Sequence, residues 1–567
     1  MLEISKKAKK PLHRKGHKIA IGILVFLLLV FFAGVWYWDN YKEKIIREKI
    51  IAAINKKSNG LYHATIEDLK IRRIGNTVTI TNMVILYDSL KYAALVNTHT
   101  APSTLMKITF PRIVLTGLKT PLRKLKYRLE AKKLQVFDPN IELISTHEKK
   151  DTLSHDLAKK LYKQILGNMD LIHFDAVSFS GANFRSIDLR DREEDLAINS
   201  MNLNLVDIHI DSLSGDDSTR ILFARKIAIG SENISWYSST RYYQYIFKGV
   251  SFNTNDNDLA IGELHIKPQL SETDFASAMH YQSDRLDVDL GQVMIKDLRT
   301  AQVMKEAIWA ESLDIKTTSV KLYRDIGLPR MPDKIAALNI SEQLMQIPLP
   351  IMFKTATFPN LSISYRERND KTRQVGDVRF DNSSLAIQNL TNMPSELASN
   401  NICRIDASTT AVNLIPVRLA LVLPLGSVDG RFFIEGRTAA GLDLVRLNDM
   451  LGPMGLTRIK SGHMNSLHFK FNGNNSGLNG SVTGLYDNLK IDFLEVGEDH
   501  KINKRHFGSL LRGFFIKDDN PHKKDPVRVA QVNYPRDKSR SFYNLIWKSI
   551  MNGITTTITA GKGMKGS

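Results

Sequence analysis

The most apolar part of the chain is residues 19–38, IAIGILVFLLLVFFAGVWYW, which contain no charged side chain. In a helix these twenty residues rise about 1.5 Å each and can cross the roughly 30 Å hydrocarbon layer of a bilayer. The run begins at Ile19 and ends at Trp36, Tyr37 and Trp38, where an aromatic belt would meet the membrane interface. The sequence therefore predicts one transmembrane helix that anchors the protein.

The tail before this helix, residues 1–18, is strongly basic. Against Glu3 it carries Lys6, Lys7, Lys9, Lys10, Arg14, Lys15 and Lys18. Basic flanks stay on the cytoplasmic side, so we expect a cytoplasmic N-terminus and a body that lies beyond the membrane from Asp39 onward. A cleaved signal peptide is the alternative, but its apolar region would be shorter and would end in small residues rather than three aromatic ones.

Residues 39–60 predict an amphipathic helix. Ile46, Ile50 and Ile54 recur at helical spacing between Lys and Glu residues, and Gly60 is placed to end the helix. We expect this helix to cap the end of a sheet. Direct contact with the membrane surface is the other interpretation, because amphipathicity alone does not distinguish the two.

From Leu61 the apolar period changes to two, which indicates β-strands. Val78, Ile80, Val84 and Leu86 alternate with polar residues after a Gly-Asn turn signal. Comparable short runs, separated by Asn, Asp, Gly and Ser, recur to about residue 500. The predicted fold is mostly β, an elongated and twisted antiparallel sheet curled into an open apolar groove.

Three ten-residue runs share apolar residues at relative positions 1, 3, 8 and 10: LQVFDPNIEL, IAIGSENISW and LDIKTTSVKL. The spacing suggests a degenerate repeat with a turn or bulge in its middle, which turns both apolar pairs toward one surface. An ordinary β-sandwich core explains the same residues, and both interpretations stay open. The predicted groove-lining residues are Leu134, Val136, Ile141, Leu143, Ile227, Ile229, Ile234, Trp236, Leu313, Ile315, Val320 and Leu322.

Further helices are expected to cover the edges or ends of the sheet. Their apolar stripes fall at 151–168, 271–279 and 301–309, and near the C-terminus at 507–515 and 542–554.

Charge and chemical motifs narrow the class of protein. The net charge is +19, of which the basic tail holds +6, and the remainder is spread among acids rather than clustered as nucleic-acid binding requires. Cys403 is the single cysteine, so a disulfide framework and a cysteine-rich zinc site are excluded. We find no metal-ligand motif, no nucleophile elbow and no phosphate-binding glycine loop. We therefore expect no enzyme, no cofactor and no metal.

Three stretches together resemble the AsmA-like family of diderm bacteria, especially a Bacteroidota branch, whose members are related to repeating β-groove lipid-transfer proteins. They are SNGLYHATIEDLKIRRIGNTVTITNMVIL after the first helix, IPLPIMFKTATFPNLSISYRER at 347–368, and the region from LNDMLGPMGLTRIKSGHMNSLHFKFNGNNSGLNGSVTGLYDNLKIDFLE to SFYNLIWKSIMNGI.

The resemblance implies an inner-membrane protein with a periplasmic groove that shields phospholipid acyl chains and contributes to their transport toward the outer membrane. It divides the body into a groove segment at 61–346, a second at 347–498, and C-terminal amphipathic helices and a tail at 499–567. An outer-membrane or envelope protein partner is the other expectation. The alternative function is an envelope scaffold or outer-membrane protein assembly factor with a closed β core.

Overall fold

The computed structural model describes residues 42–72, 76–119, 128–146, 169–189, 193–214, 217, 219–221, 223–303, 305–330, 338–370, 373–412, 414–438, 441–448, 457–496, 502–504 and 517–559. The predicted tail at 1–18, the membrane segment at 19–38 and the helices at 151–168 and 507–515 lie outside these residues. Within the described residues, none of the helices combines the length and the apolar character needed to cross a bilayer.

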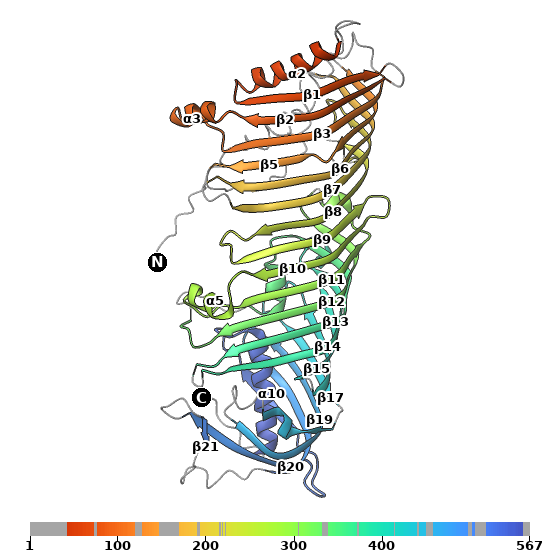
Figure 1. The fold of residues 1–567 in the computed structure, drawn as a ribbon. Coiled ribbons are helices and arrows are strands. Elements are labelled where there is room, and N and C mark those ends of the chain that lie inside the picture. Colours follow the sequence, from red (N-terminus) through yellow and green to blue (C-terminus); the bar gives the residue numbers. More distant parts are fainter. Residues whose placement is uncertain are drawn as a thin grey trace, which may run out of the picture. The chain divides into compact units, whose positions relative to one another are not determined.

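Strands make up most of the described chain, as predicted, and they pair into a mixed sheet (Figure 1). The chain divides into two compact units. The first comprises residues 1–238, 245–262 and 300–306, and the second comprises residues 239–244, 263–299 and 307–567. This division falls earlier in the chain than the segment boundary expected at residue 347.

The strands of the first unit follow one another across the sheet. They are β1 (Tyr62–Arg72), β2 (Thr77–Tyr87), β3 (Thr104–Leu118), β4 (Arg128–Phe137), β5 (Asn140–Ser145), β6 (Leu171–Asp188), β7 (Glu194–Ile210) and β8 (Ala224–Tyr237). Strands β9 (Tyr243–Asn253) and β10 (Asp258–Pro268) contain residues of both units. In the first unit β3 pairs with both β4 and β5, and each of these two pairs with β6.

The second unit continues the same kind of pairing. Its strands are β11 (Arg285–Lys296), β12 (Ile308–Asp325), β13 (Ile351–Arg368), β14 (Val375–Thr391), β15 (Ile402–Ala411), β16 (Ile415–Pro424), β17 (Phe432–Thr438), β18 (Leu442–Asp443), β19 (Thr457–Asn474), β20 (Gly477–Val496), β21 (Ile502–Lys504) and β22 (Ala530–Pro535). In both units the described strands join through backbone hydrogen bonds rather than forming two stacked layers. A β-sandwich therefore does not describe either unit.

The prediction of an antiparallel sheet is wrong at three pairings of the described strands. Strand β6 runs parallel to both β4 and β5, and β13 runs parallel to β12. After β12 the connection at 326–350 returns the chain to the end at which β12 began, since Ile308 pairs with Ile351 and Asp325 with Arg368. A parallel pair needs such a crossover, which the sequence pattern did not reveal.

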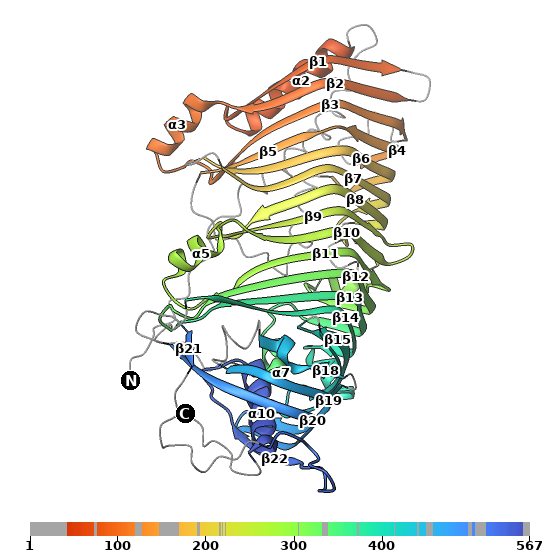
Figure 2. The ribbon, with the colours of Figure 1, turned by 60° about the horizontal axis from the view of Figure 1, so that its bottom comes forward.

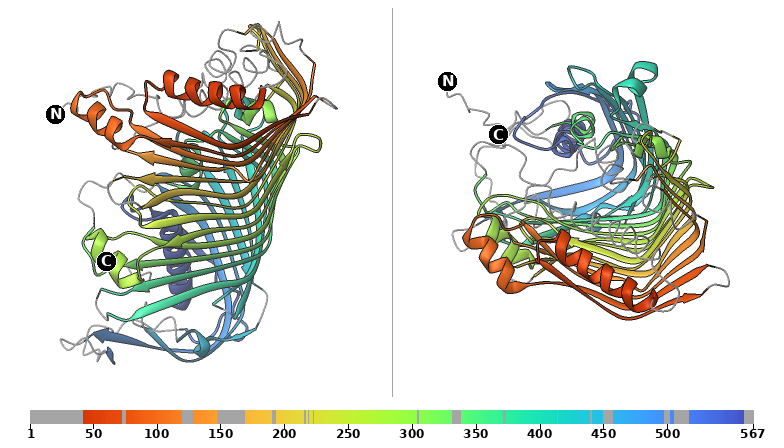
Figure 3. Two further views of the ribbon diagram at one scale, coloured as in Figure 1. Left: turned by 45° about the horizontal axis from the view of Figure 1, so that its top comes forward. Right: turned by 90° about the horizontal axis from the view of Figure 1, so that it is seen from above.

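The repeat spacing has a structural cause in the middle of the strands. In β2 the buried residues are Val78 and Ile80 and then Met83 and Ile85, so the alternation shifts by one residue. The shift occurs at Asn82, whose backbone is left-handed (φ 47°). Gln292 in β11 is left-handed in the same way (φ 53°). Figure 3 shows the strands bent along their length.

The bend turns apolar residues on both sides of it toward one face. The spacing of 1, 3, 8 and 10 therefore describes a bent strand, and several strands that were not predicted to carry it have it too. They place apolar residues at 106, 108, 113 and 115 in β3, at 196, 198, 203 and 205 in β7, at 286, 288, 293 and 295 in β11, at 356, 358, 363 and 365 in β13, and at 378, 380, 385 and 387 in β14.

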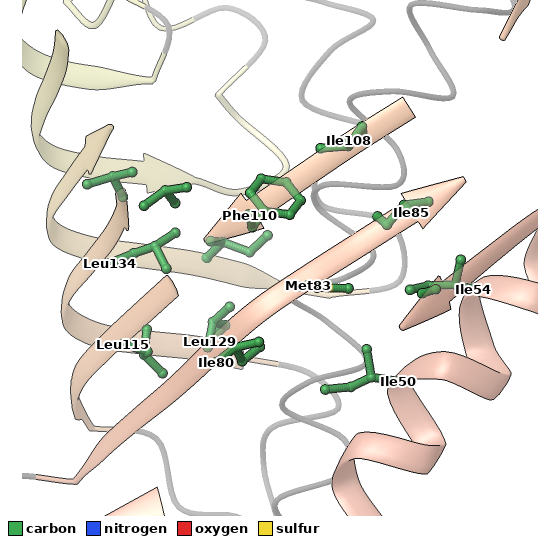
Figure 4. Packing of buried hydrophobic residues seen from close by; sticks show 14 of the residues in the cluster. Ile50, Ile54, Ile80, Met83, Ile85, Ile108, Phe110, Leu115, Leu129 and Leu134 are labelled. Atoms are coloured by element: carbon green, nitrogen blue, oxygen red, sulfur yellow. The ribbon is translucent and has the colours of Figure 1, made fainter. Parts of the chain in front are cut away.

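The helices confirm part of the prediction. Helix α2 (Lys42–Lys57) packs Ile50 and Ile54 against the strands of the first unit, as the cap interpretation requires (Figure 4). Helices α5 (Glu272–Met279) and α10 (Phe542–Ile558) also lie where they were predicted. The helix expected at 301–309 is shorter: α6 ends at Val303, because Trp309 already pairs with Met352 in the sheet and is buried.

Three helices were not predicted: α3 (Ser89–Asn97), α7 (Ile340–Met345) and α8 (Pro394–Ser399). Helix α10 lies inside the curve of the last strands of the second unit, where Phe542 and Leu545 join the buried cluster of Phe471 and Val532 (Figure 3). This packing closes that end of the sheet with an apolar core.

Candidate functional site

In the first unit the predicted groove residues lie in rows of directly paired residues that cross the strands. Three of these rows run from β1 to β8 and are apolar throughout. One row is Ile71, Val78, Leu115, Leu134, Val177, Leu205 and Ile227. The next is Leu69, Ile80, Ile113, Val136, Phe179, Leu203 and Ile229. The third is Ala64, Ile85, Ile108, Ile141, Phe184, Ile198 and Ile234. Paired residues share a face of a sheet, and we call this side the apolar face.

The last two predicted residues of this unit, Leu143 and Trp236, belong to a fourth row. Leu143 pairs with Ser186 of β6, and Trp236 pairs with Leu196 of β7. The Trp236 ring stacks on Tyr245 and Phe247 of β9, with centroids 5.3 and 5.0 Å away. All three rings are partly exposed, so the apolar face ends here in accessible aromatic surface.

Exposure rises along two of the three rows of the first unit, whereas Ile227, at the β8 end of the other row, stays buried. Ile85 and Ile108 in β2 and β3 are at most 3% exposed. In β7 and β8, Ile198 and Ile234 of the same row are partly exposed. The face is therefore a sealed core near α2 and becomes accessible toward β8.

In the second unit the other four predicted residues lie on one face as well. Val320 lies in the row Val288, Val320, Ile363, Phe380, Ala411 and Ile415. Leu322 lies in the row Leu286, Leu322, Tyr365 and Val378. Leu313 lies in the row Ile295, Leu313, Ala356, Ile387, Ile405, Leu421, Ile434 and Phe471. Ile315 pairs with Val293 beside that row.

Burial along these rows is high beneath α10, but it is also high at Ile315 and Ala356 in β12 and β13, which are 5% and 0% exposed. Ile434 and Phe471, at the end covered by α10, are 7% and 0% exposed. Val320, Ile363 and Phe380 are partly exposed instead. The apolar face of the second unit is thus closed by α10 at β17 to β22, whereas at β12 to β14 it is accessible only in part, at Val320, Ile363 and Phe380.

Charged groups border the apolar stripe at both strand ends. At one end Lys354 lies 2.6 Å from Glu311. At the other, Arg324 donates two hydrogen bonds of 2.6 Å to Asp284. Burial opposes the charge on Arg324, but its bonds to Asp284 outweigh this and raise its pKa. Between these borders, the strand from Leu313 to Leu322 is about 30 Å long at roughly 3.3 Å per residue. This length is comparable with the thickness of the hydrocarbon core of a bilayer.

Tyr365 marks the polar border more closely. Its ring lies in the apolar row with Leu322, while its hydroxyl donates a hydrogen bond to Glu367 two residues further along β13. Burial, together with this bond, raises the pKa of Tyr365, so the side chain stays neutral and hydrogen-bonded. Sequence reasoning did not single out Tyr365, Ile363 or Phe380. The 1, 3, 8, 10 spacing in β13 and β14 was the signal that could have found them.

The opposite, polar face carries a cavity of about 530 Å³ over β13 to β17. Its charged side chains are Asp406, Arg418, Glu435 and Arg437, and the rest of its lining is largely apolar and includes Pro359, Leu385 and Leu419. Hydrogen bonds from His468 and Arg437 hold the pKa of Glu435 below its usual range. None of the predicted groove residues lines this cavity.

Only one group of described residues has the spacing of metal ligands: Asp518, Asp519 and His522. Asp519 accepts a hydrogen bond from the Asn488 backbone, and His522 lies 3.4 Å from Asp519. The Nδ1 atom of His522 is buried and makes no hydrogen bond, while Asp518 is exposed.

No protein-family model matches the chain, and no curated protein matches it in sequence.

The reactivity of the Cys403 thiol reports whether the buried side of the sheet is tightly packed. Its side chain is 0% exposed, and burial raises the pKa of the thiol from 9.0 to about 11. Because the thiolate is the reactive form, we expect the folded protein not to react with 5,5′-dithiobis(2-nitrobenzoate) at pH 8 and to react fully in denaturant. Because the unfolded thiol ionises more readily, the stability contributed by the buried thiol falls as the pH rises from 9 toward 11. Rapid labelling of the folded protein, seen in the thionitrobenzoate absorbance, would contradict this.

Proposed function

We propose that the protein is a membrane-anchored, AsmA-like lipid-binding protein that shields acyl chains on its apolar faces and contributes to phospholipid transport between the inner and outer membranes. The observation that carries the proposal is the row of Val320, Ile363 and Phe380, which is apolar across several strands yet partly exposed. A water-soluble β-protein ordinarily buries such residues under a second layer, and a large accessible apolar surface marks a binding site.

The mechanism is passive and needs no reaction or cofactor. An acyl chain lying on the apolar face leaves water, and each buried CH₂ contributes roughly 0.8 kcal/mol. The charged borders at Glu311–Lys354 and Asp284–Arg324 stay hydrated and suit the position of a headgroup. In this proposal the segment at 19–38 holds the protein in the inner membrane, with the body in the periplasm and no role for nucleic acid.

A second function, an envelope scaffold or outer-membrane protein assembly factor, is favoured by one observation. Around α10 the second unit has a closed core of Phe432, Phe471 and Phe542, and a closed apolar face is what the scaffold hypothesis requires. Native mass spectrometry separates the two functions. Co-purified phospholipid supports lipid binding, whereas a lipid-free protein with a stoichiometric protein partner supports scaffolding.

Photocrosslinking tests the proposed function directly. We expect p-benzoylphenylalanine in place of Phe380, on the apolar face, to crosslink to phospholipid in living cells after ultraviolet irradiation. Gln388, an exposed residue of the same strand opposite Arg404, is the matched control and should give no lipid adduct. The adducts are identified by mass spectrometry of the purified protein. Equal lipid labelling at both positions, or none at either, would contradict the proposal.

A further inference from the structure

Helix α3 is apolar but packs little of its surface. None of its nine residues is buried. Leu90 is 83% exposed and Val96 is 43% exposed. Figure 2 shows α3 standing clear of the strands at the β1 end of the first unit. A short apolar helix normally packs against a hydrophobic core. The exposed apolar side of α3 therefore indicates a binding surface.

The helix has two distinct sides. Tyr92 and Leu95 turn toward the first unit and pack against its core, and the Tyr92 ring meets Tyr87 edge-on at 6.4 Å. Leu90, Ala93 and Ala94 are exposed on the other side. With Val96, one helical turn after Ala93, these residues follow one another at helical spacing, and we call them the α3 patch: Leu90, Ala93, Ala94 and Val96.

A chain of hydrogen bonds fixes α3 relative to α2. Asn55 of α2 lies 2.9 Å from His63 of β1, and the other ring nitrogen of His63 lies 3.2 Å from Asp88. Asp88 caps α3 by accepting a hydrogen bond of 2.9 Å from the Lys91 backbone. The bonds from Lys91 and His63 hold the pKa of Asp88 below its usual range. The α3 patch is thus held in a set orientation beside α2.

We propose that the α3 patch lies in the interface of the membrane that anchors the protein, with α2 beside it on the lipid headgroups. This proposal rests on the anchor in the proposed function. The predicted membrane segment ends at Trp38 and α2 begins at Lys42, so the connection is too short to carry the first unit away from the bilayer.

Charge and area both favour a bilayer over a protein partner. The exposed side of α2 carries Lys44, Lys49, Lys56 and Lys57 against Glu43 and Glu48, which suits anionic headgroups. A stable protein interface buries about 800 Å² on each partner, more than one short helix offers. Insertion at a membrane interface needs only a few apolar side chains with a basic flank.

Site-specific fluorescence on the full chain tests this contact. Leu90→Cys is labelled with a nitrobenzoxadiazole probe in nanodiscs of phosphatidylethanolamine and phosphatidylglycerol. The native Cys403 is buried and stays unlabelled. We expect a blue-shifted emission that is quenched by nitroxide-bearing lipid and protected from aqueous iodide. Leu213→Cys is the matched control, because Leu213 is a 75% exposed leucine of the same unit outside the patch, and its probe should show the opposite behaviour.

Two outcomes overturn the proposal. Iodide quenching of the Leu90 probe to the level of the Leu213 probe means that the patch faces water. A blue shift that appears only when each nanodisc holds two copies of the protein means that the patch binds a second chain. Crosslinking at Phe380 proceeds independently of either result, so failure of the membrane contact and failure of lipid binding on the sheet are observed separately.

Discussion

Replacing Val320 and Leu322 with Asp should remove bound phospholipid from the purified protein while leaving it folded. Both side chains are partly exposed on the apolar face, so a carboxylate there can stay hydrated when no lipid is present. With an acyl chain in place, the same carboxylates would lose water without gaining a partner. Each 1.4 kcal/mol of that cost weakens binding about tenfold, and an unpaired buried charge costs more than this.

Lys321→Glu is the matched control. It changes the net charge by the same amount as the double substitution, and it lies between the two positions on the opposite face of β12, where Lys321 pairs with Asp287. Exposed charges of this kind contribute little to stability. We expect its lipid content, measured by mass spectrometry after gentle purification, to equal that of the unchanged protein.

The neutral variant Val320→Asn with Leu322→Asn separates charge from polarity and should retain an intermediate amount of lipid. Circular dichroism and thermal melting establish that each variant is folded. If the folded Asp variant carries as much lipid as the unchanged protein, acyl chains do not lie on this face. In that case the scaffold function becomes the better explanation.

The bent strands show what could be predicted from the sequence. The pattern of Ile227, Ile229, Ile234 and Trp236 was enough to indicate a common face on either side of a mid-strand irregularity, and the pairing with β7 bears this out. Side-chain alternation is a local property, so a short run of sequence contains it. The same spacing in β13 and β14 went unnoticed because polar residues at the bend differ from strand to strand.

Strand direction could not be predicted in the same way. Whether β13 runs parallel to β12 depends on where the connection at 326–350 delivers the chain, which is set by tertiary packing rather than by alternation. The prediction of a helix over residues 301–309 was wrong at its C-terminal end for a related reason. Trp309 has a helical neighbourhood in sequence, but its pairing with Met352 and its hydrogen bond to Glu396 place it in the sheet.

The solvent accessibility of the apolar face could not be predicted from the sequence either. Leu313 and Phe471 lie in the same row, but Leu313 is partly exposed whereas Phe471 is covered by α10, an element far away in the chain. A core residue and a binding-surface residue are equally apolar, and only the surrounding structure distinguishes them.

Truncating Phe471 should destabilise the closed end of the second unit more than any substitution on the accessible face. The ring is 0% exposed, stacks on Phe469 at 5.4 Å and lies in the cluster that α10 covers. Phe471→Ala should therefore lower the free energy of opening β17 to β20 by about 3–5 kcal/mol, measured by hydrogen exchange and mass spectrometry of peptides from these strands.

The matched control for Phe471 is Phe433, a phenylalanine on the neighbouring strand that is partly exposed on the polar face beneath Lys470. Phe433→Ala should cost about 1 kcal/mol or less. Because α10 packs on the cluster, loss of Phe471 should also raise the exchange rate of α10, whereas Val320 lies outside it and its strand should keep its protection. Equal effects of the two substitutions would mean that the end beneath α10 is loosely packed. The sheet would then have no closed end, and an acyl chain could reach β17 to β22 as readily as β12 to β14.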